Sequence, residues 1–104
     1  MAIKEIDRDN FKNEVLDSKV PVLVDFNASW CGPCRMLKPI IDSVSEEKKD
    51  YKFVSVNIDN NEELAEEYGI LSIPCLIIIK DGKEVNRSVG LLPKEELEKF
   101  LGGK

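Results

Sequence analysis

Residues 30–34 read Trp-Cys-Gly-Pro-Cys and lie between a nearly continuous apolar run and a segment with helical spacing. Two cysteines separated by two residues at the start of a helix can reach each other across one turn. Cys31 falls at the predicted cap position, where free backbone N–H groups and the positive helix end favour a thiolate. Pro33 presets the helical dihedral angle, and Gly32 lets a partner's backbone approach closely. The stretch therefore predicts an exposed, activated thiol on Cys31 and a second thiol, Cys34, tucked into the helix.

Two other interpretations of this cysteine pair stay open. Both thiols can be packed in a core, although the Gly-Pro between them suits the start of a helix better. The Cys-x-x-Cys spacing also occurs in zinc sites. Zinc usually takes four nitrogen or sulfur ligands, and Cys75 is the only further cysteine in a chain without histidine. A fourth ligand would have to be a carboxylate or water, so we expect no metal and no cofactor.

The segments around the cysteine pair alternate between strand and helix patterns. Turn signals and apolar spacing predict strands at 2–6, 20–26, 51–58, 75–79 and 83–89. The same signals predict helices from a cap at Asp7 or Asp9 to about residue 18, at 33–44 with a kink at Pro39, at 60–69 and at 93–101. This βαβαβαββα order predicts an α/β fold with a mixed sheet and helices on both faces.

Composition and charge narrow the functional classes. The chain has 104 residues, 42% hydrophobic and 34% charged, as expected for one globular domain spanning residues 1–104. A formal net charge of −5 argues against nucleic acid and anionic membranes as partners. The absence of histidine removes catalysis by Ser-His and Cys-His pairs. The N-terminal residues lack the apolar core of a secretory signal, so we expect a cytoplasmic protein without a membrane partner.

Asp25 is a further candidate functional residue, because its carboxylate lies within a predicted buried strand. Desolvation favours the neutral form of such a group and raises its pKa. One interpretation puts Asp25 on an exposed strand edge. The other makes it a group that exchanges a proton with a thiol.

Together these motifs resemble those of thioredoxins over essentially the whole chain. The matching residues are the stretch at 30–34, Val24-Asp25-Phe26, Ala28, Pro39, Asn57-Ile58-Asp59, Tyr68-Gly69-Ile70, Ser72-Ile73-Pro74, Asp81-Gly82 and Val89-Gly90. A Cys-x-x-Cys alone is a weak signal, but the preceding Trp, the internal Gly-Pro and the later Ile-Pro make the match specific. The resemblance implies a thioredoxin fold, with a mixed five-stranded sheet flanked by four helices. It also implies that Pro74 is cis and packs against Cys31 and Cys34.

The same resemblance implies a protein dithiol–disulfide oxidoreductase. Cys31 would attack a client disulfide, and Cys34 would resolve the mixed disulfide with Asp25 as its general base. The implied client-docking surface is flat and apolar and consists of Trp30, Gly32, Pro33, Ile58, Ile70, Ile73, Pro74 and Gly90. Taken singly, Ile58 and Ile70 fit a core position equally well.

The implied partners are a thioredoxin reductase, either NADPH-linked or ferredoxin- or flavin-linked, and client proteins that contain disulfides. The protein would act as a monomer in electron transport and cell redox homeostasis. Gly-Pro between the cysteines and the missing signal favour a reductase over an oxidase or an isomerase. A small zinc-binding module, or a binding protein of the same fold without turnover, is the alternative function.

Three positions depart from the thioredoxin pattern. Asn27 stands where Trp is common, and Cys75 stands where Thr is common after the cis-Pro. Ser55 stands where a strand lysine commonly approaches the buried Asp, and Lys52 does not replace that lysine because strand alternation points it to the opposite face. We therefore predict a pKa of Asp25 above that in lysine-bearing thioredoxins, and a buried, unreactive Cys75.

Overall fold

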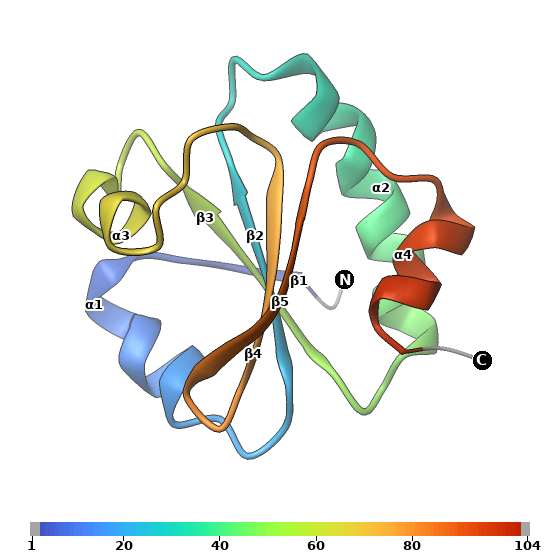
Figure 1. Cartoon of the computed structure of the whole chain (residues 1–104), viewed down its shortest axis with the longest axis horizontal. Coiled ribbons are helices and arrows are strands. Elements are labelled where there is room, and N and C mark those ends of the chain that lie inside the picture. Colours follow the sequence, from blue (N-terminus) through green and yellow to red (C-terminus); the bar gives the residue numbers. More distant parts are fainter. Residues whose placement is uncertain (1–2, 103–104) are drawn as a thin grey trace.

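A mixed five-stranded sheet runs through the centre of the molecule (Figure 1). The computed structural model describes residues 3–102, so Ala2 of the first predicted strand lies outside the described residues. The strands are β1 (Ile3–Ile6), β2 (Val22–Asn27), β3 (Lys52–Asn57), β4 (Cys75–Lys80) and β5 (Lys83–Val89). They lie in the order β1-β3-β2-β4-β5, with β1 and β2 parallel to β3, β4 antiparallel to β2, and β5 antiparallel to β4.

Helices cover both faces of this sheet (Figure 1). They are α1 (Arg8–Phe11), which continues as the π-helical turn η1 (Lys12–Leu16), α2 (Gly32–Glu47), α3 (Glu62–Glu67) and α4 (Lys94–Phe100). The α1–η1 segment and α3 lie on one face, and α2 and α4 lie on the other. The predicted mixed sheet with four flanking helices is thus confirmed. Within residues 3–102, no helix is both long enough and apolar enough to cross a membrane.

Strand alternation decides which side chains of β2 and β3 face α2. Val22, Val24 and Phe26 belong to the core under α1 and α3, whereas Leu23 belongs to the core under α2 and α4. Successive side chains point to opposite faces, so Asp25 shares the α2 side with Leu23. In the parallel register Asp25 lies directly opposite Ser55 of β3. The sheet therefore brings these two polar side chains together beneath the start of α2.

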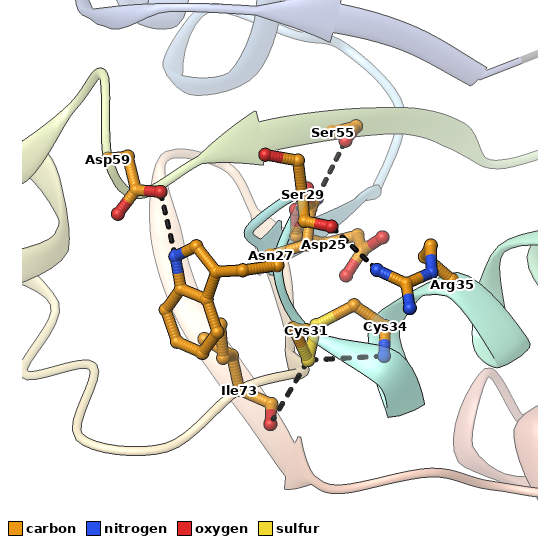
Figure 2. Close-up of a disulfide and its surroundings, with 10 residues drawn as sticks. Asp25, Asn27, Ser29, Cys31, Cys34, Arg35, Ser55, Asp59 and Ile73 are labelled. Carbon is orange, nitrogen blue, oxygen red and sulfur yellow. Dashed lines mark hydrogen bonds between the residues drawn. A yellow bond between two sulfur atoms is a disulfide. The ribbon is translucent and has the colours of Figure 1, made fainter.

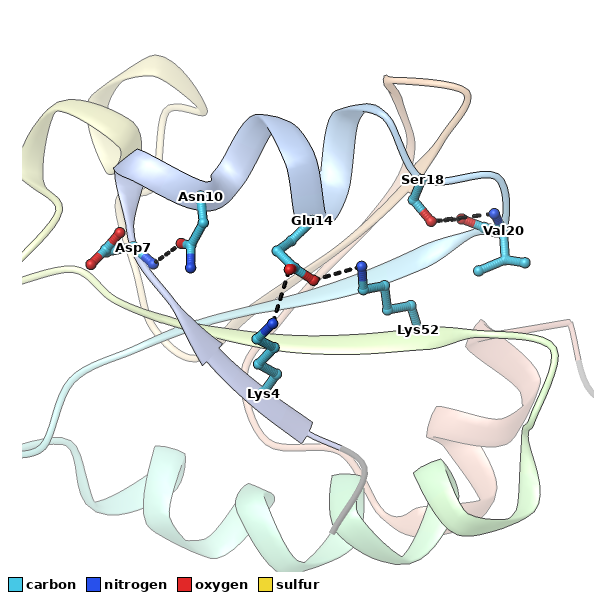
Figure 3. A network of polar contacts seen from close by, with 7 residues as sticks. All are labelled: Lys4, Asp7, Asn10, Glu14, Ser18, Val20 and Lys52. Carbon is cyan, nitrogen blue, oxygen red and sulfur yellow. Dashed lines mark hydrogen bonds and ion pairs between the residues drawn. The ribbon is translucent and has the colours of Figure 1, made fainter.

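Lys52 of β3 lies on the opposite face of the sheet, as strand alternation predicts (Figure 3). Lys52 lies 2.7 Å from a carboxylate oxygen of Glu14 in η1, and Lys4 of β1 donates to the other oxygen at 2.9 Å. The two ammonium groups lower the pKa of Glu14 to about 2. Lys52 is therefore held on the α1 side of the sheet, away from Asp25, as predicted.

The first helix differs from the regular helix that its apolar spacing predicts. Asp7, not Asp9, is its N-cap, and the Asp7 and Asn10 side chains form a reciprocal capping box (Figure 3). Beyond Phe11 the backbone widens, and the amide of Asp17 donates to the carbonyl of Lys12, five residues back, at 2.9 Å. Hydrophobic spacing indicates which residues face the core, but it does not distinguish this wider turn from an α-helix.

Candidate active site

The two cysteines of the 30–34 stretch form a disulfide at the N-terminus of α2 (Figure 2). Their Cα atoms are 5.3 Å apart. Cys31 is the N-cap of the helix, and the amide of Cys34 donates to its Sγ at 3.2 Å. A turn in which the Cys31 amide donates to the carbonyl of Ala28 at 3.2 Å leads from the end of β2 into the helix. The predicted cap position of Cys31 is confirmed.

The predicted difference in exposure between the two cysteines is wrong for the disulfide form. Cys31 and Cys34 are each 5% exposed. The Sγ atoms of Cys31 and Cys34 are bonded to each other, and both residues cluster with buried Ala28. Ile58 and Ile73 pack against this cluster and cover it further. The exposed fractions therefore do not distinguish Cys31 from Cys34 in the disulfide form, whereas the positions of the two residues on the helix do.

The loop before β4 lies beside Cys31. The peptide bond between Ile73 and Pro74 is cis, as the resemblance implies. The carbonyl oxygen of Ile73 lies 3.9 Å from Sγ of Cys31 (Figure 2). Pro74 is buried, and its carbonyl accepts a hydrogen bond from the amide of Gly90 at 2.8 Å. Three of the predicted docking residues thus meet at the Cys31 end of the sheet, and Ile73 packs against the cysteines.

The other predicted docking residues divide between surface and core. Trp30 is 66% exposed, and its indole N–H donates to Asp59 at 2.8 Å (Figure 2). Pro33 is exposed and Gly32 is half-buried. Ile58 packs against both the cysteine cluster and the core under α1 and α3, whereas Ile70 packs against that core alone. Sequence reasoning missed Leu71, which is 97% exposed two residues before Ile73; exposure of a single apolar loop residue leaves no signal in the sequence.

Asp25 is buried in the central strand β2 and is only 6% exposed, so its interpretation as an exposed edge residue is wrong. Burial raises the pKa of its carboxyl group to about 7, and the positive charge of Lys38 and the amide of Asn27 partly oppose that rise. Its Oδ1 atom has no hydrogen-bond partner among the described residues. The carboxyl group is therefore able to exchange a proton near neutral pH.

A cavity of about 530 Å³ connects Asp25 with the start of α2. Its lining consists of Glu5, Asp25, Asn27, Ala28, Ser29, Cys34, Arg35, Lys38, Ser55 and Asn57. The amide of Asn27 donates to the backbone carbonyl of Asp25 at 2.8 Å and to the hydroxyl of Ser55 at 2.7 Å (Figure 2). Asp25 and Cys34 thus share one cavity, at whose wall Asn27 and Ser55 are bonded to each other.

Among residues 3–102, no three His, Cys, Asp or Glu side chains are grouped closely enough to hold an ion. Cys75, the third sulfur considered for zinc, is in β4, opposite Phe26 of β2 and Val89 of β5.

Comparison with known proteins agrees with this geometry. The family described as Thioredoxin matches residues 2–102. The chain is 46% identical to a thioredoxin of Porphyra purpurea over 102 residues, which cover 97% of this chain and 95% of the relative. It is 52% identical to thioredoxin 1 of Synechococcus elongatus over 92 residues, 88% of this chain and 86% of the relative. A thioredoxin of Rickettsia prowazekii is 47% identical over 91% of both chains.

The chain belongs to the thioredoxin family. Like other thioredoxins, it is a dithiol–disulfide oxidoreductase, and the Cys31–Cys34 pair supplies its redox-active disulfide. Membership of the family implies a reductase that supplies electrons and client proteins that contain disulfides.

Two of the positions that depart from the thioredoxin pattern, Asn27 and Ser55, both line the cavity beside Asp25. Lys38 lines the same cavity, and sequence reasoning missed it. The one feature of the sequence that indicates a role for Lys38 is its spacing of four residues from Cys34, which puts both on the same face of the helix. The chain therefore has a cation near its buried acid, supplied by α2 instead of β3.

The third departure, Cys75, is 1% exposed, and burial raises the pKa of its thiol. We expect Cys75 to resist alkylation in the native, reduced protein and to react at the rate of an ordinary thiol once the chain is unfolded. Mass spectrometry after iodoacetamide treatment with and without guanidinium measures both states. Rapid labelling of native Cys75 would contradict an inert role.

Proposed function

We propose that this thioredoxin reduces client disulfides in two exchange steps, with Cys31 as the nucleophile and Cys34 as the resolving thiol. The Cys31 thiolate attacks one sulfur of the client disulfide, and the other client sulfur leaves as a thiolate. Cys34 then loses a proton and attacks Sγ of Cys31, which releases the second client sulfur and closes the Cys31–Cys34 disulfide. Two electrons pass to the client in each cycle, and a reductase restores the dithiol.

The observation that carries this assignment is the place of Cys31 at the N-cap of a helix of 16 residues. The amide of Cys34 donates to Sγ of Cys31 at 3.2 Å, and in the reduced protein the same bond stabilises a thiolate. The positive end of the helix acts in the same direction. Cys34 lies inside the first turn and lacks this cap position, so it is the thiol that needs a base.

We assign the role of that base to Asp25. It lines the same cavity as Cys34, and its pKa of about 7 is close to the pH at which the exchange takes place. General bases work best when their pKa is near the working pH, because they are then ionised often enough and still hold a proton well. The proton of Cys34 passes to Asp25, directly or through water admitted by the polar cavity.

The docking surface for clients surrounds the Cys31 end of the sheet. We propose that it consists of Trp30, Gly32, Pro33, Ile58, Ile70, Ile73, Pro74 and Gly90. The exposed side chain of Trp30 and the closeness of Ile73 to Sγ of Cys31 support this surface. Leu71, at 97% exposed, extends it with another apolar side chain. An extended client segment would pair with the backbone at Ile73 as an added strand does.

We further propose that residues 1–104 act as one domain and as a monomer in the cytoplasm. A net charge of −5 disfavours self-association, and a reducing compartment keeps a dithiol and a free Cys75 reduced. The proposed electron donor is a thioredoxin reductase, NADPH-linked or ferredoxin- or flavin-linked, and the cycle would serve electron transport and cell redox homeostasis.

Two measurements on the reduced protein test the assignment of the thiols. We expect iodoacetamide near pH 7 to label Cys31 at least about tenfold faster than Cys34, because only Cys31 has a helix-stabilised thiolate. Peptide mapping after short exposures gives the two rates. The unmodified protein should accelerate reduction of insulin by dithiothreitol, and the sample labelled on Cys31 should not. Preferential labelling of Cys34 would reverse the two roles.

A further inference from the structure

The cavity beside the dithiol brings together a buried acid, a thiol and a cation from two different elements. Asp25 comes from β2, and Cys34 and Lys38 come from α2, where they are four residues apart on one face. Lys38 is exposed, so its ammonium group is on the solvent side of the cavity. The lining also contains Asn27 and Ser55, two of the three positions where this chain departs from the thioredoxin pattern.

We propose that Lys38 is a positioning residue for proton exchange, whose ammonium group acts across the cavity to stabilise the ionised carboxylate of Asp25. The inference rests on the proposed role of Asp25 as the base for Cys34. Lys38 touches neither the client nor the reacting sulfurs in this scheme. It acts through Asp25, by favouring the form that can accept the proton of Cys34.

The polar groups nearest to Asp25 favour its carboxylate less than the charge of Lys38 does. Oδ1 of Asp25 has no hydrogen-bond partner among the described residues. The amide of Asn27 is bonded to the backbone carbonyl of Asp25 and to Ser55, and the hydroxyl of Ser55 carries no charge. The charge of Lys38 is the largest influence that lowers the pKa of Asp25, and the amide of Asn27 adds a smaller one.

Other titratable groups around Asp25 do not take the place of Lys38. Arg35, also on α2, lines the cavity and keeps its positive charge while it donates to the carbonyl of Ser29 at 2.8 Å, but this charge is not among the influences that lower the pKa of Asp25. Glu5 of β1 lines the cavity and acts in the opposite sense, because its negative charge disfavours a second carboxylate. Cys75 of β4 stays neutral near pH 7 because burial raises the pKa of its thiol. The residues of β3 that line the cavity, Ser55 and Asn57, do not titrate in this range.

The first test is a titration of the Asp25 carboxyl carbon by NMR in the oxidised protein. In Lys38→Met we expect the pKa of Asp25 to rise by about half a unit to one unit, because an opposing charge is removed. Lys38→Arg keeps the charge and should restore the original value. Lys19→Met is the matched control, since it removes an exposed lysine that precedes β2, at the end of the strand away from the dithiol. An unchanged Asp25 titration in Lys38→Met would overturn the proposal.

The second test asks whether the charge of Lys38 reaches the reaction through Asp25. Reduced protein mixed with an aromatic disulfide such as dithiobis(nitrobenzoate) releases one coloured thiolate when Cys31 attacks and a second when Cys34 resolves. The midpoint of the pH profile of the second phase should move to higher pH in Lys38→Met, by the same amount as the Asp25 titration. In an Asp25→Asn background, Lys38→Met should cause no further shift.

The outcomes separate this inference from the proposed function. A shift that persists in the Asp25→Asn background would show that Lys38 acts on the thiols directly, and would overturn the proposal. The proposal would also be overturned if Lys38→Met shifts the pKa of Asp25 but leaves the pH profile of the second release phase unchanged. Failure of the unmodified protein to reduce insulin would instead contradict the proposed function, and the NMR titration would still decide whether Lys38 influences Asp25.

Discussion

Cys34→Ser is expected to abolish turnover and to leave Cys31 joined to its client through a stable mixed disulfide. Closure of the Cys31–Cys34 bond is fast because the second thiol is held in place, with the two Cα atoms 5.3 Å apart. A serine hydroxyl does not become a nucleophilic anion near neutral pH, so the attack that releases the client is lost. Measured without dithiothreitol, the second thiolate released from an aromatic disulfide should appear at least about 10³-fold more slowly in Cys34→Ser, in line with the advantage of a positioned nucleophile.

Trapped complexes provide the second readout of the same variant. On non-reducing gels Cys34→Ser should form adducts with disulfide-containing proteins, and dithiothreitol should release them. Cys75→Ser is the matched control, because Cys75 is 1% exposed and takes no part in the proposed cycle; it should keep full turnover and trap nothing. Release of the client by Cys34→Ser without an added thiol, or adducts that form through Cys75, would contradict the assignment.

Asp25→Asn is expected to stabilise the protein above pH 7 while it slows the resolving step. Burial raises the pKa of Asp25 from 3.8 to about 7, so the folded state disfavours the charge that the unfolded state carries freely. The resulting loss of stability begins as the pH rises past about 3.8, grows up to about pH 7 and is constant beyond it. An uncharged asparagine removes this loss.

The size of the gain follows from the shift. About three pKa units at about 1.4 kcal/mol per unit correspond to at most about 4 kcal/mol in the free energy of unfolding. Urea denaturation at a series of pH values should show this gain at pH 8 and almost none at pH 3, where Asp25 is protonated in both states. Asp50→Asn, in the exposed turn before β3, is the control and should change stability little at either pH. A gain independent of pH would contradict the assigned cause.

The kinetic effect of Asp25→Asn should be confined to the second exchange step. Cys31 keeps its cap position and its hydrogen bond from the amide of Cys34, so the first thiolate released from an aromatic disulfide should appear at the original rate. The second should appear more slowly by about 10²-fold, the usual contribution of a positioned general base. Equal slowing of both phases would indicate a general disturbance of the site and not the loss of a base.

The strands and side-chain orientations that apolar runs and alternation predict agree with the structure. The apolar run at 20–26 predicted a buried strand, and the central position of β2, between β3 and β4, explains why both of its faces are apolar. Alternation along β3 correctly put Lys52 on the face away from Asp25, where it pairs with Glu14. Local pattern failed at η1, because a π-helical turn buries Val15 as an α-helix would.

By itself, the sequence determined the dithiol at a helix cap, the order of strands and helices, and the presence of an acid in a buried strand. These follow from spacing along the chain, because helical and strand periodicities are local properties of the backbone. Only the tertiary structure decided that Cys31 and Cys34 are equally covered when oxidised, and that Asp25 shares a cavity with Lys38. Those relations depend on how α2 packs across β2 and β3, and the distance between side chains of different elements is set by packing and not by their separation in sequence.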